Sequence, residues 1–167
     1  MNINKILQQR WLAVVALIVR LVIGCIFLIT GYSKVRPLEG MTWSIASLKI
    51  SVSWFALSGE AYQILPHWAI TVVAHVLPFA ELTLGLWLIL GLALKTPALA
   101  STLIVGTFFI AILSAYLRGL NIGCGCGLVP NEQVGPRALA IDGTLFMLCV
   151  LLTVRAFRPG PKPDGML

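Results

Sequence analysis

Charged side chains are scarce in this sequence. Lys, Arg, Asp and Glu account for 11% of its 167 residues and hydrophobic residues for 59%, whereas charged residues make up about 25% of an ordinary soluble domain. A soluble domain of this length could not bury so much apolar surface, so the composition indicates a chain whose main solvent is lipid. The formal net charge is +6, but no Lys/Arg run is interleaved with aromatic residues. The basic residues are therefore expected to flank membrane spans and not to bind nucleic acid.

Four hydrophobic segments have the length needed to cross a bilayer, about 20 residues each. Backbone groups in hydrocarbon must satisfy their own hydrogen bonds, so these segments are expected to be helices. The sequence thus predicts an all-α polytopic membrane protein, a four-transmembrane-helix bundle that forms one domain over residues 1–157. The predicted spans are residues 11–31, 68–94, 97–117 and 137–154.

Two other segments are predicted to lie outside the bilayer. Residues 41–59, MTWSIASLKISVSWFALSG, contain Lys49 and five serines, and their apolar residues recur at steps of three and four. This spacing is typical of an amphipathic helix, which we expect on the extracytoplasmic membrane surface between the first and second spans. Residues 158–167 are polar and rich in proline and glycine, which predicts a disordered cytoplasmic tail.

The distribution of basic residues favours a cytoplasmic location for both termini. With four spans the termini share one side of the membrane, and basic pairs occur near both of them. The loop between the third and fourth spans would then face the periplasm, with the chain in the bacterial inner membrane. The residues on the side of the termini are Lys5, Arg10, Lys95, Arg155, Arg158 and Lys162, and those on the other side are Lys34, Arg36, Lys49, Arg118 and Arg137.

The loop RGLNIGCGCGLVPNE, residues 118–132, carries Cys124 and Cys126 with one glycine between them. A disulfide needs Cα atoms within about 7 Å, which residues two apart reach in a bend, and Gly125 removes the steric objection to that bend. The small ring is expected to be strained, and strain makes a disulfide a better oxidant. Flanking glycines leave room for the thiol of a partner protein to attack. The pair is our candidate catalytic site for thiol–disulfide exchange in an oxidising compartment.

Two other interpretations of the pair stay open. Two thiolates could capture a soft metal ion such as Cu(I), as part of a binding or transport module. The pair could also be structural, in a scaffold that holds another membrane subunit. A structural zinc site wants four ligands, and His67 would supply only a third, so no metal site is predicted beyond the Cu(I) alternative. If the chain is an enzyme, it is a thiol–disulfide oxidoreductase.

Ionisable residues within the spans are candidates for a pocket or relay below this loop. Such residues are costly in hydrocarbon and usually paired. At ~1.5 Å rise per residue, Arg20 and Glu81 fall at similar depths, so we expect a buried ion pair between them. The pair would be a structural lock, or Glu81 would relay a proton or orient a small ligand such as a quinone. In another interpretation Arg20 forms no pair and its side chain extends to the inner face of the membrane. Three further residues in the outer halves of their spans could line the same pocket: His75, Asp142 and Cys25.

Each of these three residues also has a simpler interpretation. His75 could hydrogen-bond a backbone carbonyl group. Asp142 could pair near the end of its helix with Arg137. Cys25, like Cys149, could be a buried thiol that acts as a small hydrophobic side chain.

The same segments contain motifs of a known membrane protein family. The first span ends in Gly-x-x-Lys, the second carries Pro-x-x-Glu-x-x-x-Gly, and an arginine leads into the Cys-Gly-Cys loop, with a final helix at matching spacing. The chain resembles the MauE branch of the DoxX-like membrane proteins over most of residues 11–157, and its layout is more distantly similar to vitamin K epoxide reductase-like bundles. The matching stretches are residues 20–35, residues 62–91 with Pro78, Glu81 and Gly85, and residues 118–127.

This resemblance implies a role in methylamine utilisation. MauE-like proteins are associated with maturing or exporting a disulfide-rich periplasmic amine dehydrogenase subunit, beside a thioredoxin-like partner. The implied partners are therefore the lipid bilayer, a periplasmic thioredoxin-fold protein and that subunit. No cofactor is required, although a quinone could be the final electron acceptor. The family commonly has Phe-Gly after the second cysteine, whereas this chain has Gly127-Leu128, so a contact with the partner could differ.

Overall fold

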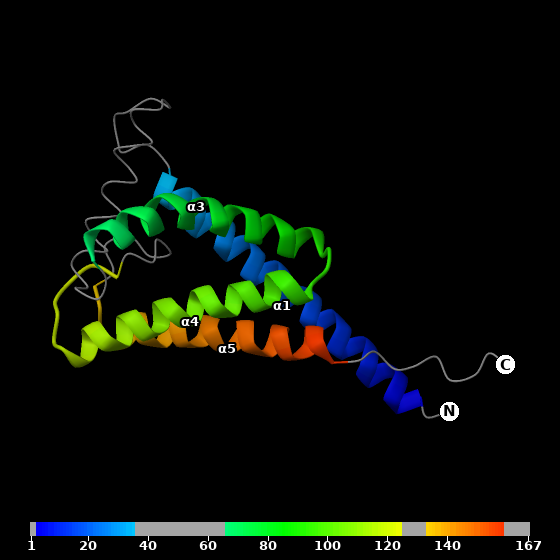
Figure 1. Ribbon diagram of the computed structural model, residues 1–167. Coiled ribbons are helices and arrows are strands. Elements are labelled where there is room, and N and C mark those ends of the chain that lie inside the picture. The colour runs from blue at the N-terminus through cyan, green and yellow to red at the C-terminus, as the bar shows by residue number, and fades with distance from the viewer. Residues whose placement is uncertain (1–2, 36–65, 125–132, 159–167) are drawn as a thin grey trace.

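The computed structural model describes residues 3–35, 66–124 and 133–158. This part of the chain contains four long helices, whose arrangement Figure 1 shows, and the described residues form no strand beyond an isolated bridge between Gly123 and Gln133. The prediction of an all-α, four-helix protein is confirmed. The expected surface helix and nearly all of the expected tail lie outside the described residues. The helices are α1 (Ile3–Val35), α3 (His67–Leu90), α4 (Lys95–Leu117) and α5 (Pro136–Phe157).

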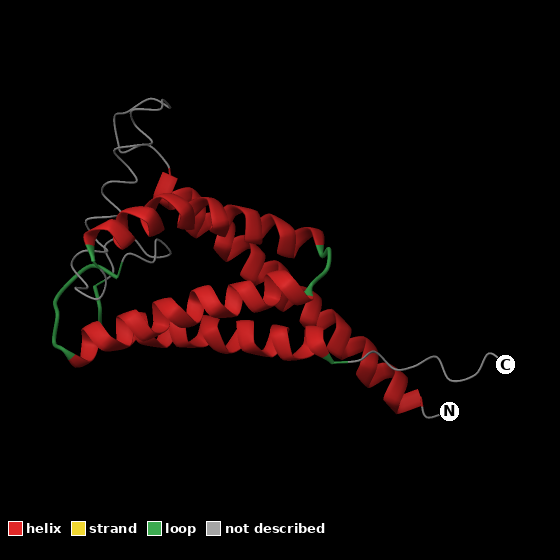
Figure 2. Cartoon of the chain, viewed as in Figure 1, coloured by secondary structure: helices red, strands yellow, loops and turns green. Residues whose placement is uncertain are grey.

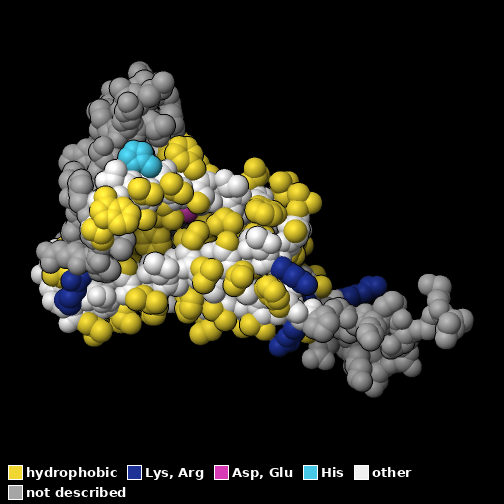
Figure 3. Space-filling model, in the orientation of Figure 1, with side chains coloured by type: hydrophobic (Ala, Val, Ile, Leu, Met, Phe, Trp, Pro, Cys, Tyr) yellow, Lys and Arg dark blue, Asp and Glu magenta, His cyan; other side chains and the backbone are white. Residues whose placement is uncertain are grey.

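All four helices are long and apolar enough to cross a membrane. They agree with the predicted spans to within a few residues, except that α1 begins at Ile3, well before residue 11. Five of the eight preceding residues, from Lys5 to Arg10 without Ile6, are good helix formers, and the stretch extends the helix beyond its apolar part. Large hydrophobic side chains cover much of the outer surface, as Figure 3 shows for one face. Only lipid can cover such a surface, so the chain is a multi-pass membrane protein.

The helices are arranged as two antiparallel pairs, in which α1 packs along α3 and α4 packs along α5. Figure 2 shows the pairs meeting at the short turn between α3 and α4 and diverging towards the opposite end. The beginning of α1 and the end of α5 lie at the end with the turn, which we call the terminal end. The opposite end, where α4 leads through Cys124 towards α5, is called the Cys124 end.

Small residues allow α1 and α3 to approach closely. A Cβ atom added to Gly85 would lie 2.8 Å from the carbonyl oxygen of Gly24, and one added to Gly31 would lie 3.0 Å from the carbonyl oxygen of Pro78. In lipid, helix association depends on this kind of close backbone packing, because there is no hydrophobic force between helices. The contacts also fix the register of the pair, with Gly24 opposite Gly85.

Two apolar clusters occupy different levels of the bundle. The larger cluster, in the terminal half, joins all four helices. The smaller cluster is at the Cys124 end, between α4, α5 and the residues that connect them. The larger comprises Ile23, Phe27, Leu84, Leu88, Ala98, Val105, Cys149 and Leu152, and the smaller comprises Ile112, Ala115, Cys124, Val134 and Ala138.

Candidate functional site

A buried ion pair joins α1 to α3. The Lys34 Nζ atom lies 2.6 Å from Oε1 and 2.7 Å from Oε2 of Glu81, so the ammonium group donates to both carboxylate oxygens. The two side chains are only 4% and 5% exposed. Thr30, one turn before Lys34, also approaches the Glu81 carboxylate. Charges at this position in a membrane protein are stable only when paired in this way.

Helix geometry explains how Lys34 reaches Glu81 from the last turn of α1. Side chains on a helix lean towards its N-terminus, so the Lys34 side chain points back into the bundle and not out to the membrane surface. With Gly24 opposite Gly85, Lys34 lies beyond the level of Glu81, and the long side chain covers the difference. This pairing was not predicted from the sequence, although Lys34 is the lysine of the Gly-x-x-Lys motif.

Asp142 on α5 adds a second buried carboxylate to this level. It is 8% exposed, and its main electrostatic partner is Lys34. Its Oδ2 atom is buried without a hydrogen-bond partner in the described part of the chain. The aromatic ring of Phe108 on α4 completes the group, because its centroid lies 5.4 Å from the Lys34 Nζ atom. We call Lys34, Glu81, Asp142 and Phe108 the charged layer.

The charged layer lies between the two apolar clusters. On α5, Asp142 falls between Ala138 of the smaller cluster and Cys149 of the larger one. On α4, Phe108 likewise falls between Val105 and Ile112. In Figure 3 the acidic atoms appear as a small recessed patch between hydrophobic side chains, where the two helix pairs diverge. The layer therefore lies in the bundle interior, one level below the cluster that contains Cys124.

Cys124 is held in place by the end of α4 and by the start of the segment that leads into α5. Gly119, at φ 69°, ends the helix. Its N–H donates to the Tyr116 carbonyl at 3.0 Å, and the Leu120 N–H donates to the Ala115 carbonyl at 3.1 Å, a pattern that glycine favours at helix ends. Five residues after Gly119, Cys124 enters the smaller apolar cluster.

The two ends of the segment 125–132, which lies outside the described residues, are fastened together. Gly123 and Gln133 form an antiparallel bridge, and the Val134 N–H donates to the Ile122 carbonyl at 2.9 Å. This bridge sets the position of Cys124, which is 2% exposed. The sequence predicted an open thiol here, whereas the structure places the sulfur under apolar neighbours at the end of the bundle. Cys126 lies outside the described residues.

The predicted pairing of Arg20 with Glu81 is wrong. Glu81 pairs with Lys34, and the Arg20 guanidinium lies against Gly91, where an added Cβ atom would be 2.6 Å from its Nη1 atom. Gly91 ends α3 in the left-handed region at φ 75°, so the cation sits beside the carbonyl end of that helix, where positive charge is favoured. The register of α1 on α3 explains the difference, because residues opposite Arg20 lie near the end of α3.

The other residues predicted for the pocket divide into those that enter the charged layer and those that do not. His75 is exposed on α3, and its Nδ1 atom lies 2.8 Å from the Thr71 carbonyl oxygen, as its simpler interpretation predicted. Cys25 is exposed on α1, so its expected burial is wrong. Cys149 is buried, as predicted. The structure thus brings Glu81 and Asp142 together and leaves His75 and Cys25 on the lipid-facing surface.

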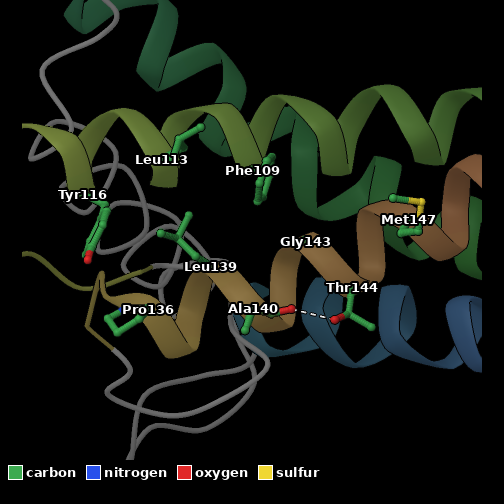
Figure 4. A pocket seen from close by; sticks show the side chains of 9 residues that line it. All are labelled: Phe109, Leu113, Tyr116, Pro136, Leu139, Ala140, Gly143, Thr144 and Met147. Carbon is green, nitrogen blue, oxygen red and sulfur yellow. Dashed lines mark hydrogen bonds between the residues drawn. The ribbon is translucent and has the colours of Figure 1, made fainter.

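A shallow apolar groove of about 680 Å³ runs between α4 and α5 on another face of the bundle. Figure 4 shows its lining side chains, including Phe109 and Met147, with the Thr144 hydroxyl donating to the carbonyl oxygen of Ala140. By helical periodicity Ala140, Thr144 and Met147 lie on the side of α5 away from Asp142. The groove contains no thiol or charged side chain, so it is separate from the charged layer and from Cys124.

The described residues contain no group of three His, Cys, Asp or Glu side chains that could hold a metal ion. The two carboxylates of the charged layer are accompanied by Lys34, which already supplies a cation to Glu81. This part of the chain therefore presents an ammonium group and two carboxylates in the charged layer and a thiol at Cys124.

The fold and these groups define a class: a polytopic four-helix membrane protein with a charged layer in its interior and a thiol-bearing loop at one end. The family model described as methylamine utilisation protein MauE matches residues 12–155. The chain belongs to the MauE family, and is thus a membrane protein of a family named for methylamine utilisation. Neither the search of curated proteins nor the search of solved structures gave a match.

Proposed function

We propose that this protein is a thiol–disulfide redox factor of methylamine utilisation that exchanges electrons between Cys124/Cys126 and a periplasmic thioredoxin-fold partner. The observation that carries the proposal is the bridge between Gly123 and Gln133, which holds Cys124 at one end of a bundle of helices long and apolar enough to cross a membrane. In this proposal the bundle lies in the inner membrane with cytoplasmic termini. The Cys124 end then faces the periplasm, where disulfides persist. A disulfide-rich amine dehydrogenase subunit would be the final substrate.

The proposed exchange proceeds through a mixed disulfide. A thiolate of the reduced partner attacks the Cys126 sulfur of the Cys124–Cys126 disulfide, forming the partner–Cys126 bond and releasing Cys124 with the electron pair of the broken bond. The second thiol of the partner then attacks the partner sulfur that is bonded to Cys126. This forms the partner's own disulfide and releases Cys126. Two electrons pass from the partner to the pair, and the reverse sequence returns them to an oxidised partner.

The burial of Cys124 supports this division of roles. At 2% exposure its sulfur has no room for an in-line approach by another protein, so the proposal assigns the partner contact to Cys126. Cys124 then acts within the chain, as the leaving group in one direction and as the resolving thiol in the other. This assignment predicts different behaviour for the two single variants.

Cys124→Ser is expected to accumulate a mixed disulfide between Cys126 and the partner, because the resolving thiol is absent. Non-reducing electrophoresis of protein from acid-quenched, alkylated cells should show a higher-mass species that disappears on reduction. Cys126→Ser, in which only the buried Cys124 thiol is left, should show little or none of this species. The double variant Cys124→Ser/Cys126→Ser is the negative control.

Absence of the reducible species from Cys124→Ser would overturn the proposed exchange. Metal analysis of the purified reduced protein addresses soft-metal capture directly. Stoichiometric copper that is lost in the double variant would favour capture and contradict the redox proposal.

A further inference from the structure

The apolar groove between α4 and α5 reaches the Cys124 end of the two helices. Its lining extends from Phe109 to Tyr116 on α4 and from Pro136 to Met147 on α5. Tyr116 is the residue before the last one of α4, and Pro136 is the first residue of α5. Because both helices are long enough to span the bilayer, the groove begins at a membrane surface and runs towards the interior. We call the end of the groove between Tyr116 and Pro136 its mouth.

The length of the groove corresponds to one leaflet of a bilayer. Pro136 and Met147 are eleven residues apart on α5, which is about 16 Å along the helix axis. The hydrocarbon core of a bilayer is about 30 Å thick, so each leaflet contributes about 15 Å. From Met147 onwards α5 continues to Phe157 without lining the groove. The groove thus covers the depth over which the acyl chains of one leaflet extend.

The base of the groove is formed by close contact of the two helices. A Cβ atom added to Gly143 would lie 3.2 Å from Cε2 of Phe109, so the missing side chain at Gly143 gives the groove its depth. The Phe109 ring is stacked on Phe146, with centroids 5.9 Å apart. The Thr144 hydroxyl donates to the Ala140 carbonyl oxygen at 2.7 Å and is thus satisfied within α5, as Figure 4 shows. These walls suit a hydrocarbon chain.

Polar groups that can bind an anion are located at the mouth. Arg137 follows Pro136 directly, Arg118 follows Tyr116 by two residues, and both arginines are exposed. A guanidinium group has five N–H donors, so each can bind a phosphate oxygen in addition to a partner within the chain. Figure 4 shows the Tyr116 side chain extending from α4 at this end of the groove, with its hydroxyl group outermost. The N-terminus of α5, where positive charge is concentrated, begins here as well.

No acidic side chain offsets this positive charge among the residues that the structure describes at the mouth. In the described ranges the acidic residues are Glu81 and Asp142, and both are buried in the charged layer. A headgroup with net negative charge is therefore attracted to the mouth, whereas the ammonium group of a zwitterionic headgroup is repelled by the same arginines.

We propose that this groove binds an anionic phospholipid from the leaflet at the Cys124 end. One acyl chain lies in the groove between Phe109 and Met147, and the phosphate lies at the mouth, within reach of Arg118, Arg137 and the Tyr116 hydroxyl. The depth of the groove selects a lipid chain, and the charge at its mouth selects an anionic headgroup. The site is separate from the charged layer and does not depend on the proposed thiol–disulfide exchange.

The first test is photo-cross-linking of the unaltered full-length protein in phosphatidylcholine bilayers. The probe is a phosphatidylglycerol with a diazirine in its acyl chain, and the comparison is a phosphatidylcholine with the same chain. Trypsin releases nearly all of the groove in two peptides, residues 96–118 and 138–155. We expect the groove residues in these peptides to be labelled about 5-fold more by the anionic probe, the factor that corresponds to one arginine at a charged membrane surface.

The lipid-facing surfaces of α1 and α3 provide the reference in the same sample. They contact bulk lipid, so both probes should label them equally. Equal labelling of the groove residues by the two probes would overturn the proposal, and this comparison requires no substitution in the protein.

The second test measures phosphatidylglycerol bound to variants by native mass spectrometry of the protein in mild detergent. Arg118→Gln/Arg137→Gln removes the charge at the mouth, and we expect at least a 5-fold lower occupancy of the first bound lipid. Ala140→Phe leaves the charge unchanged and fills the groove with a ring, and should cause a similar loss. Normal occupancy in the Ala140→Phe protein would contradict binding in the groove.

Two matched variants separate the groove from general effects of charge and size. Arg155→Gln removes an arginine at the opposite end of α5, and Ala13→Phe makes the same enlargement at an exposed position of α1. Both should bind phosphatidylglycerol like the unaltered protein. A loss in Arg155→Gln as large as in the double arginine variant would assign the binding to net charge and overturn the proposal. Loss of a dimer in Ala140→Phe with unchanged lipid occupancy would assign the groove to a second copy of the chain and likewise overturn it.

Discussion

Replacing Lys34 with methionine is expected to lower the free energy of unfolding by about 3–5 kcal/mol, the range found when one partner of a buried ion pair is removed. The change leaves Glu81 and Asp142 buried in the membrane interior without the cation that Glu81 binds at 2.6 and 2.7 Å. It also removes the charge that attracts Asp142 across the two helix pairs. The measurement is the unfolding midpoint of purified protein in mixed micelles of mild detergent and dodecyl sulfate.

Two comparisons distinguish the loss of the ion pair from the loss of a lysine. Lys95→Met makes the same change at an exposed residue, whose Nζ atom lies 5.8 Å from the Phe157 ring centroid, and should alter stability by about 0.5 kcal/mol or less. The double variant Lys34→Met/Glu81→Met should regain much of the loss, because apolar residues often replace a buried ion pair at little cost. If the Lys34→Met protein is as stable as the original, the ion pair of the charged layer does not contribute to the stability of the bundle.

Replacing both Cys124 and Cys126 with serine is expected to abolish growth on methylamine in a strain that depends on this protein for it. Exchange through a mixed disulfide has no alternative nucleophile in the proposed mechanism, so activity should fall to the level of a deletion. The protein should still accumulate in the membrane, because the larger apolar cluster, which joins all four helices, and the charged layer do not involve these sulfur atoms. Growth rate and immunodetection in membranes are the two measurements.

The remaining two cysteines provide matched controls for this experiment. Cys25 is exposed on α1 and Cys149 is buried in the larger apolar cluster, so neither has a place in the exchange. Cys25→Ala and Cys149→Ala should both support growth. Normal growth of the Cys124→Ser/Cys126→Ser strain would instead favour a scaffold with inert thiols.

The sequence was sufficient to predict the four membrane-spanning helices, because the requirement for about 20 apolar residues and for internal backbone hydrogen bonds leaves little choice. The extra length of α1 was missed because its first turns are polar. An even number of spans also puts the beginning of α1 and the end of α5 at the same end of the bundle, as Figure 1 shows.

The partner of Glu81 could not be predicted from depth along each helix. Counting residues from helix ends assumes that the ends are level, whereas the close contact of Gly24 with Gly85 fixes a different register. In that register Arg20 meets the end of α3 and Lys34 reaches Glu81. Such a shift depends on three-dimensional packing of small residues, although the inward lean of the Lys34 side chain is predictable from helix geometry alone.

The burial of Cys124 could likewise not be predicted from the sequence. Glycines on both sides of the cysteines indicate conformational freedom, but not which sulfur faces the bundle. The bridge between Gly123 and Gln133 and the apolar contacts with Ile112 and Ala138 decide that position. They place Cys124 against the bundle, and the proposed exchange therefore assigns the contact with the partner to Cys126.

The most direct test of the proposed redox role is the labelling of intact cells with a membrane-impermeant maleimide, in a Cys25→Ala/Cys149→Ala background so that only the Cys-Gly-Cys pair reports. We expect little labelling before reduction and strong labelling of Cys126 after brief treatment with a reductant. Thiols that label fully without reduction, or that label only once the membrane has been opened, would contradict it.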